Sequence, residues 1–212
     1  QDISSMFAIE AAGIKGKKLK VLDMCAAPGG KSMLAADLLS KDSDITACDI
    51  TILKTRLIDE NTGRCGFKNI DTLIKNAEEY DEEFKERFDL VIADVPCTGY
   101  GVMGRKPDIR YKASKERQHE LARIQKNIID NAVRYVKPGG KLIYSTCTIS
   151  TEENEYNVEY ILENKSFKPV DISENLPDGY KETTAVKGYI QLLPGKDPCD
   201  GFFAAVFKKD KK

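Results

Sequence analysis

The sequence predicts an α/β fold in which a mostly parallel, seven-stranded sheet carries helices on both faces. Short β-branched runs alternate along the chain with segments of helical periodicity, which is typical of parallel sheets. One run, FDLVIAD at 88–94, is continuously apolar, as expected for a strand that is buried on both faces. The length of 212 residues and the hydrophobic fraction of 41% fit one large domain with a buried core.

The first half of the chain is expected to contain three strands and two helices in alternation. The expected strands are 19–25, 44–50 and 69–76, and the expected helices are 31–40 and 53–66. The second helix has Leu53, Leu57 and Ile58 on one face. Gly63 or Gly66 is expected to end it, because glycine commonly follows the last helical turn.

The second half begins with the strand at 88–94 and a long loop at 95–113. Ser114 is predicted to cap a helix whose apolar residues recur at 3.6-residue spacing as far as Val136. The sequence KPGG then ends this helix, and KLIYSTC at 141–147 is the fifth expected strand.

The last segment is expected to contain one more helix and two weaker strands. Ser150 and Glu153 have the spacing of a capping box, in which the serine and glutamate side chains satisfy free amides at a helix start. They predict a helix over 151–164. The weaker strands are expected near 188–193 and 202–207.

Composition excludes several classes of protein. No apolar run approaches the roughly 20 residues that a membrane helix needs, and no secretory signal opens the chain, so we expect a cytoplasmic protein with no membrane partner. The six cysteines include no Cys-x-x-Cys pair, which argues against a metal site and against a disulfide scaffold. The net charge of -1 does not by itself indicate nucleic-acid binding.

A glycine-rich loop follows the first expected strand. In CAAPGGK, at 25–31, small residues would let the backbone approach a ligand, and free amides at the next helix start favour an anion. The loop has neither phosphate-loop nor dinucleotide spacing. Asp49 follows Cys25 by 24 positions, a separation at which an acid commonly binds ribose hydroxyls. The two features indicate a nucleoside-bearing cofactor; the alternative is a plain turn and a helix-capping aspartate.

Two cysteines lie at the ends of two expected strands. Cys97 follows the fourth strand and Cys147 ends the fifth, so both thiols should emerge at the carboxyl edge of the sheet, beside the glycine-rich loop. Most cysteines are small buried hydrophobes, and Cys48 and Cys65 are expected to be just that. The Cys97–Cys147 pair is equally open to a functional and to a structural interpretation on position alone.

The segment 105–126 is locally basic, with eight basic residues against three acidic ones. Arg105, Lys106 and Arg110 lie in a non-helical part of it, where a solvated helix face does not explain the charge. Tyr100 and Tyr111 flank the cluster. A basic loop with aromatic residues suits a polyanion whose bases can stack, so RNA is the expected partner.

These motifs together resemble those of the RNA cytosine-5 methyltransferases of the Sun/Fmu/NOL1/NOP2 type, most closely the branch that modifies bacterial small-subunit ribosomal RNA. The resemblance runs nearly from end to end, through QDISSM, VLDMCAAPGGKS, ACDI, FDLVIADVPCTGYGVMGRKPDIR, KPGGKLIYSTCTIS, ENE and DGFFAAVF. The combination of CAAPGGK, DVPC and STC is its most specific part.

The resemblance implies a Rossmann-like methyltransferase fold that uses S-adenosylmethionine and no metal. It also implies a set of cofactor-binding residues: Cys25, Ala26, Ala27, Pro28, Gly29, Gly30, Lys31, Asp49, Asn76 and Asp94. Asp49 would bind the ribose, and Asp94 would lie between cofactor and base. Asn76 stands where the family usually has an acid near the adenine, so the chain departs from the family pattern at this position.

The implied reaction requires a nucleophile, because carbon 5 of cytosine is itself a poor one. A thiolate that adds to carbon 6 makes carbon 5 electron-rich enough to accept a methyl group. By resemblance Cys147 attacks carbon 6, Cys97 assists product release, and Asp94 acts as a general acid toward the base. Chemistry alone allows the reverse assignment of the cysteines, which the DNA cytosine-5 enzymes use. The base must be unpaired or flipped to reach the pocket.

The expected function is therefore methylation of carbon 5 of a cytosine in RNA, with 16S ribosomal RNA as substrate and Arg105, Lys106 and Arg110 as RNA-binding residues. Alternatives are a tRNA or another RNA, DNA, a small-molecule or protein methyltransferase, and a non-catalytic RNA-binding scaffold. Residues 1–212 are expected to form the catalytic domain, with a helical lead-in at 1–18. The chain begins with Gln1 rather than Met, so an N-terminal part is expected to be missing from it, and the resemblance implies that this part is an RNA-binding domain.

Overall fold

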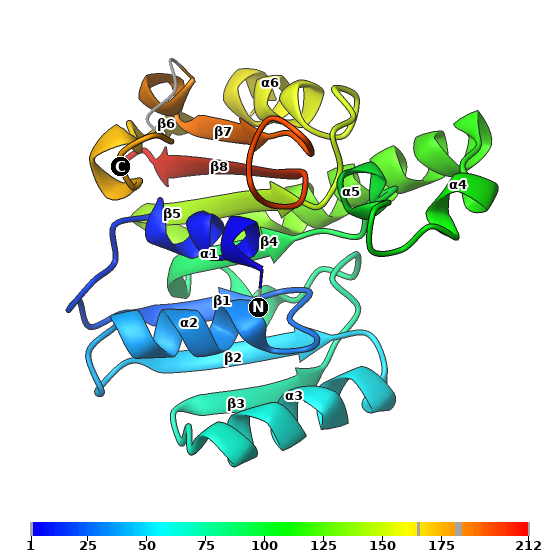
Figure 1. Ribbon diagram of the computed structural model, residues 1–212. Helices are drawn as coiled ribbons and strands as arrows, with labels where there is room; N and C mark the ends of the chain where they lie inside the picture. The colour runs from blue at the N-terminus through cyan, green and yellow to red at the C-terminus, as the bar shows by residue number, and fades with distance from the viewer. Residues whose placement is uncertain (1, 165, 181–183, 212) are drawn as a thin grey trace.

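The computed structural model describes residues 2–164, 166–180 and 184–211. Its centre is one sheet in the order β3-β2-β1-β4-β5-β8-β6, with β7 paired to β8 (Figure 1). The strands are β1 (Lys20–Asp23), β2 (Asp44–Asp49), β3 (Ile70–Ile74), β4 (Phe88–Asp94), β5 (Val136–Thr146), β6 (Phe167–Pro169), β7 (Tyr189–Leu192) and β8 (Phe202–Lys209). The first five strands are parallel, and β8 is antiparallel to β5.

Helices cover both faces of this sheet. They are α1 (Ile3–Glu10), α2 (Gly30–Leu38), α3 (Ile52–Cys65), the single turn α4 (Ile109–Lys112), α5 (Lys115–Tyr135) and α6 (Glu155–Asn164). The helices α1 and α2 lie on the viewer's side of the sheet in Figure 1. The buried side chains of α5 and α6 belong to the core on the opposite face.

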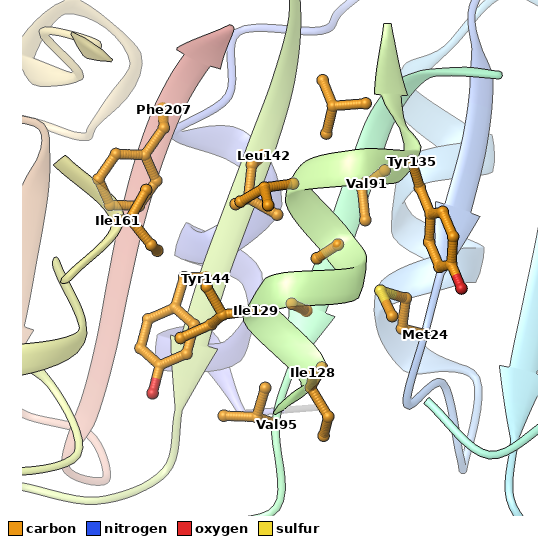
Figure 2. Close-up of a cluster of buried hydrophobic side chains, with 14 of the residues drawn as sticks. Met24, Val91, Val95, Ile128, Ile129, Tyr135, Leu142, Tyr144, Ile161 and Phe207 are labelled. Atoms are coloured by element: carbon orange, nitrogen blue, oxygen red, sulfur yellow. The ribbon is translucent and has the colours of Figure 1, made fainter. Parts of the chain in front are cut away.

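Alternate residues of the central strands feed two separate cores. In β4, Leu90 and Ile92 belong to the core beneath α1 and α2, whereas Val91 and Ala93 belong to the core beneath α5. Burial on both faces explains why this strand reads as a continuous apolar run. Figure 2 shows the second core, in which Ile128 of α5 lies close to the sheet.

The long helix α5 begins where the sequence predicted. The Ser114 side chain accepts a hydrogen bond from the Arg117 amide, and β5 takes over directly after the helix, at Val136. The expected loop at 95–113 contains the short helix α4 and a 3-10 turn at Tyr100–Val102. The KPGG sequence lies inside β5, where the pairing with β4 shifts register, so the strand starts earlier than the predicted 141.

The prediction of seven strands was wrong by one. The missed strand, β6, has three residues, of which two are exposed and one is proline, so it has no readable period. Both β6 and β7 pair with β8, β6 with Phe207–Lys209 and β7 with Phe202–Ala205. The eight strands of the described chain therefore occupy seven positions across the sheet.

The predicted capping box was also wrong. The helix α6 starts at Glu155 rather than at 151, and residues 151–154 form turns. The Glu153 side chain is buried and accepts hydrogen bonds from Thr98, so it does not reach back to Ser150. A partner 55 residues away along the chain has displaced the local one.

The strand order reverses beside β1. From this strand the chain proceeds outward through β2 and β3, and then returns to β4 on the other side. A parallel sheet leaves a crevice at such a switch point, at the carboxyl ends of the strands. In the part of the chain that the structure describes, no helix is long and apolar enough to cross a bilayer.

Candidate active site

The glycine-rich loop connects β1 to α2 at the switch point. The Ala26 amide donates to the Cys48 carbonyl oxygen at 2.8 Å, and the Ala27 amide donates to Asp49 Oδ2 at 3.0 Å, so the loop is attached to the end of β2. Gly29 has φ +99°, and a Cβ there would lie 3.3 Å from the Ile58 side chain. Glycine is therefore required at this turn, and Gly30 starts α2 directly after it.

Asp49 is held rigidly at the end of β2. The residue is only 4% exposed, yet it lines a pocket of about 240 Å³. Oδ1 accepts the Ile50 amide at 2.8 Å and pairs with Lys54 Nζ at 2.9 Å. A buried carboxylate with fixed orientation at a pocket wall is suited to accept hydrogen bonds from ligand hydroxyls.

The same pocket collects the ends of β1, β3 and β4. It is lined by Met24, Cys25, Ala27, Asp49, Ile50, Lys54, Lys75, Asn76, Ala77, Glu78, Asp94, Val95, Pro96, Ile124 and Ile128. Asn76 Nδ2 donates to Glu79 Oε1 at 3.2 Å, and Asn76 Oδ1 accepts the Glu78 amide at 3.1 Å. Glu78 supplies an acid to this wall two residues after Asn76, which the sequence analysis missed.

A second hollow, of about 160 Å³, continues from this pocket over the glycine-rich loop. It is lined by Asp2, Ser5, Asp23, Cys25, Ala26, Ala27, Pro28, Gly30, Lys31 and Asp94. All ten cofactor-binding residues predicted from the resemblance therefore lie at this edge, and nine of them line one of the two hollows. Gly29 is the exception, and it forms the turn behind them.

Asp23 is a buried carboxyl group that the sequence analysis did not single out. Its Oδ2 accepts a hydrogen bond from Ser32 Oγ at 2.7 Å, whereas its Oδ1 has no partner among the described residues. Burial raises the pKa of Asp23 to about 7. The signal in the sequence was its position, a carboxylate at the carboxyl end of an apolar strand.

Asp94 ends β4 beside both hollows. Its Oδ2 pairs with Lys31 Nζ at 2.7 Å, and its Oδ1 accepts a hydrogen bond from Ser145 Oγ at 2.7 Å. Lys31 also donates to Ser5 Oγ of α1 at 3.0 Å. Lys31, predicted as a cofactor-binding residue, thus lies between Asp94 and α1.

The two cysteines meet at the same edge. Cys97 Sγ lies 3.3 Å from Cys147 Sγ, and both residues are partly exposed. The hydrogen bond with Cys97 lowers the pKa of Cys147, with help from Lys31 and Lys106 and against the effect of burial. The same hydrogen bond, together with burial, raises the pKa of Cys97 well above the usual range. Cys147 is therefore the better nucleophile of the pair at neutral pH.

Three loops close around the thiol pair. The Gly101 amide donates to the Cys147 carbonyl oxygen at 3.1 Å, and the Gly201 amide donates to the Gly101 carbonyl oxygen at 2.9 Å. A Cβ on Gly101 would lie 2.2 Å from the Gly201 oxygen, so no other residue fits without movement. Gly99, with φ +73°, turns the chain between Cys97 and this contact.

The predicted RNA-binding residues have different environments. Arg105 forms ion pairs with Asp2 and with Asp200, so its charge ties the loop to two other segments of the chain. Lys106 and Arg110 are exposed, and neither has an ion pair within the described residues. A third hollow, of about 170 Å³, lies under this loop and is lined by Cys97, Thr98, Tyr100, Ile109, Lys112, Ala113, Arg117 and Leu121.

This architecture is the Rossmann-like methyltransferase fold. The structure is similar, with a TM-score of 0.81 and 28% identity, to a methyltransferase homologue from Pyrococcus horikoshii, covering 99% of this chain and 67% of that one. It is also similar to NSun6 from Pyrococcus horikoshii, solved with SFG, with a TM-score of 0.86 and 30% identity over 100% of this chain and 53% of that one.

The chain belongs to the family described as 16S rRNA methyltransferase RsmB/F, which matches residues 15–208. It is 37% identical to the probable ribosomal RNA small subunit methyltransferase B of Bacillus subtilis, over 99% of this chain and 47% of that protein. The resemblance indicated by the motifs is thereby confirmed. The chain spans about half the length of the curated relatives it matches.

Proposed function

We propose that this chain transfers the methyl group of S-adenosylmethionine to carbon 5 of a cytosine in RNA, through a covalent bond between Cys147 and the base. The observation that carries the proposal is the pair of thiols 3.3 Å apart at the edge that also holds the two hollows. The family description favours 16S ribosomal RNA as the substrate. The reaction is assigned to the cytoplasm, where reducing conditions keep both thiols free.

The residues present fit S-adenosylmethionine. The orphaned Oδ1 of Asp23 and the Asp94 carboxylate suit a cationic amino acid moiety, and the rigid Asp49 carboxylate suits ribose hydroxyls. The apolar side chains of Ile50, Ile124 and Ile128 suit an adenine ring, with Asn76 or Glu78 at its polar edge. When bound, the cofactor supplies a methyl group activated by a sulfonium charge.

Cys147 begins the reaction. Its thiolate forms a bond to carbon 6 of the cytosine, the electrons of the double bond between carbons 5 and 6 shift toward nitrogen 3, and Asp94, protonated from solvent as the base binds, gives its proton to nitrogen 3. Carbon 5 then becomes nucleophilic and accepts the methyl group. The Lys31 ammonium, 2.7 Å from Asp94, keeps a positive charge beside both steps.

Cys97 completes the reaction. The proton on carbon 5 passes to Cys97, the electron pair of that bond re-forms the double bond between carbons 5 and 6, sulfur leaves carbon 6 as the Cys147 thiolate, and nitrogen 3 returns its proton to Asp94. In the free protein the Cys147 hydrogen bond and charge raise the pKa of Cys97. Once Cys147 is bonded to carbon 6, its sulfur carries no negative charge and its hydrogen bond with Cys97 is lost. Cys97 then loses its proton to solvent and acts as a base toward the proton on carbon 5.

The test is methyl transfer from a labelled donor to an oligoribonucleotide with an unpaired cytosine. Cys147→Ala should abolish transfer, whereas Cys97→Ala should accumulate a covalent RNA–protein adduct visible on a denaturing gel. Cys65→Ala, at an exposed position on α3, is the matched control and should do neither. A reversed trapping pattern would exchange the roles of the two cysteines.

Wild-type protein that binds RNA without transferring the label would favour a scaffold instead of an enzyme. Equal transfer to 16S fragments and to tRNA would remove the preference for ribosomal RNA. Because the chain spans about half the length of its relatives, both substrates are offered at concentrations well above those expected for a complete enzyme.

A further inference from the structure

A buried glutamate lies behind the Cys97 loop. Glu153 is 0% exposed, and its two carboxylate oxygens accept three hydrogen bonds. Oε1 accepts from Thr98 Oγ1 at 2.6 Å, and Oε2 accepts from the Thr98 amide at 3.0 Å and from Gln125 Nε2 at 2.8 Å. All three donors are neutral groups, so none of them cancels the charge of the carboxylate.

These hydrogen bonds hold the chain on both sides of Cys97. Thr98 is the following residue, and the preceding residue, Pro96, has its carbonyl oxygen bonded by the same Gln125 amide at 3.0 Å. Gln125 cannot rotate freely, because its Oε1 accepts from Asn157 Nδ2 at 3.0 Å. Glu153 and Gln125 therefore form one clamp on the backbone that carries the Cys97 thiol.

The clamp also reaches the Cys147 loop. Thr98 Oγ1 lies 2.8 Å from Thr148 Oγ1. Because the single Thr98 hydroxyl proton goes to Glu153, the Thr148 hydroxyl must be the donor in this contact. Thr148 directly follows Cys147, so one carboxylate fixes the loops of both thiols relative to each other.

Different sets of charged side chains surround the two thiols. Glu153 faces Cys97, and its charge helps to raise the pKa of that thiol after the larger effects of the Cys147 hydrogen bond and burial. Lys31, Lys106 and Asp94 face Cys147, and the two lysines lower its pKa while Asp94 opposes them. Glu153 thus acts on Cys97, whereas at Cys147 two lysines counter the Asp94 carboxylate.

We propose that Glu153 is a positioning residue that holds Cys97 against Cys147 and keeps Cys97 as the protonated, hydrogen-bond-donating member of the pair. The proposal rests on the proposed function, in that it explains how two similar thiols acquire different roles. A carboxylate that merely supported the fold would affect stability and leave the difference between the thiols unchanged.

The experiment measures the alkylation rate of each cysteine against pH, using limiting iodoacetamide and peptide mass spectrometry on the whole chain. It needs neither RNA nor methyl donor. The wild-type protein should show a low pH midpoint for Cys147 and a high one for Cys97. Glu153→Gln should narrow the gap between the midpoints, and the ratio of the two rates at neutral pH should fall by about tenfold.

Glu152→Gln is the matched control. It removes the same charge from the neighbouring residue, whose side chain is partly exposed and lies near His119. It should leave both midpoints in place. Thr98→Val is the second variant, because it keeps the Glu153 charge and removes only the hydroxyl link. It should also reduce the difference between the Cys97 and Cys147 midpoints, by a smaller amount than Glu153→Gln does.

If Glu153→Gln does not fold, as judged by circular dichroism, Thr98→Val decides alone. Unchanged midpoints in whichever variants fold would overturn the proposal, as would coincident midpoints in the wild type. Well-separated midpoints in a protein that transfers no methyl group would instead contradict the proposed function and leave the clamp standing.

Discussion

The two halves of the active edge are built in different ways. The cofactor half is built mainly on β1, β2 and the loop between β1 and α2, and amides of that loop donate hydrogen bonds to the Cys48 carbonyl oxygen and the Asp49 carboxylate at the end of β2. The thiol half needs the loops after β4 and β5 and the segment before β8, joined by buried polar side chains. The cofactor half is therefore largely local, whereas the thiol half depends on residues about a hundred positions apart, such as Gly101 and Gly201.

The largest expected effect tests how strongly the thiol half depends on the contact between Gly101 and Gly201. Gly101→Ala adds a Cβ that would lie 2.2 Å from the Gly201 oxygen, so backbone must move. We expect the free energy of unfolding, measured by urea denaturation, to fall by about 3 kcal/mol. Alkylation of Cys147 should slow as well, because the Gly101 amide no longer holds its carbonyl oxygen in place.

Gly104→Ala is the control, since a Cβ there meets nothing within 4 Å. It should change the unfolding free energy by less than about 0.5 kcal/mol. Equal effects at positions 101 and 104 would show that the close approach of the two backbones does not limit this half of the site.

A smaller effect, in the cofactor half, depends on pH. Burial raises the pKa of Asp23 to about 7, so between pH 4 and 7 the folded chain keeps a proton that the unfolded chain has released. Stability from this group is present below pH 4 and is lost as the pH rises through 7, with a slope of at most about 1.4 kcal/mol per pH unit. Asp23→Asn should flatten this slope and stabilise the protein above pH 7.

Thermal melting at pH 4 to 8 without ligand measures the effect of Asp23. The matched control is Asp37→Asn, an exposed carboxylate on α2, which should leave the slope in place. A wild-type melting temperature that rises steadily from pH 4 to 7, with the same rise in Asp23→Asn, would mean that Asp23 is ionised in the fold.

The smallest expected effect concerns the basic loop beside the thiol half. Replacement of Lys106 and Arg110 by alanine should weaken RNA binding and reduce its salt slope by roughly 0.7 for each phosphate that the variant no longer neutralises. Arg105→Ala should change the slope less, because Asp2 and Asp200 already hold its guanidinium group. Titrations of a labelled oligoribonucleotide at several salt concentrations compare the two, and a larger slope change for Arg105 would contradict this ranking.

The sequence predicted features that depend on neighbours along the chain. The strand β4 was predicted with its observed bounds, and the Ser114 cap was confirmed, because a buried strand and a capped amphipathic helix leave regular local patterns. The meeting of Cys97 and Cys147 also followed, since strand ends at one sheet edge are adjacent. Strands, helix caps and strand ends can be predicted from local patterns, without knowing which distant side chains contact them.

What the sequence could not predict depends on long-range polar contacts. Glu153 has the spacing of a capping box, yet its partners are Thr98 and Gln125, which lie 55 and 28 residues away. Arg105 belongs to a basic run, yet it pairs with Asp2, 103 residues earlier. Periodicity and composition carry no information about which distant residues a charged side chain will contact in the folded protein.

The contact between Gly101 and Gly201 has a consequence for synthesis on the ribosome. Cys97 and Cys147 both leave the exit tunnel before residue 201 does, so the segment that contacts the loop after Cys97 is made after both cysteines. During translation the nascent chain therefore carries its two cysteines without their finished hydrogen bonds. The backbone arrangement around the thiol pair in the folded chain is therefore complete only once the segment around Gly201 has been synthesised and has docked.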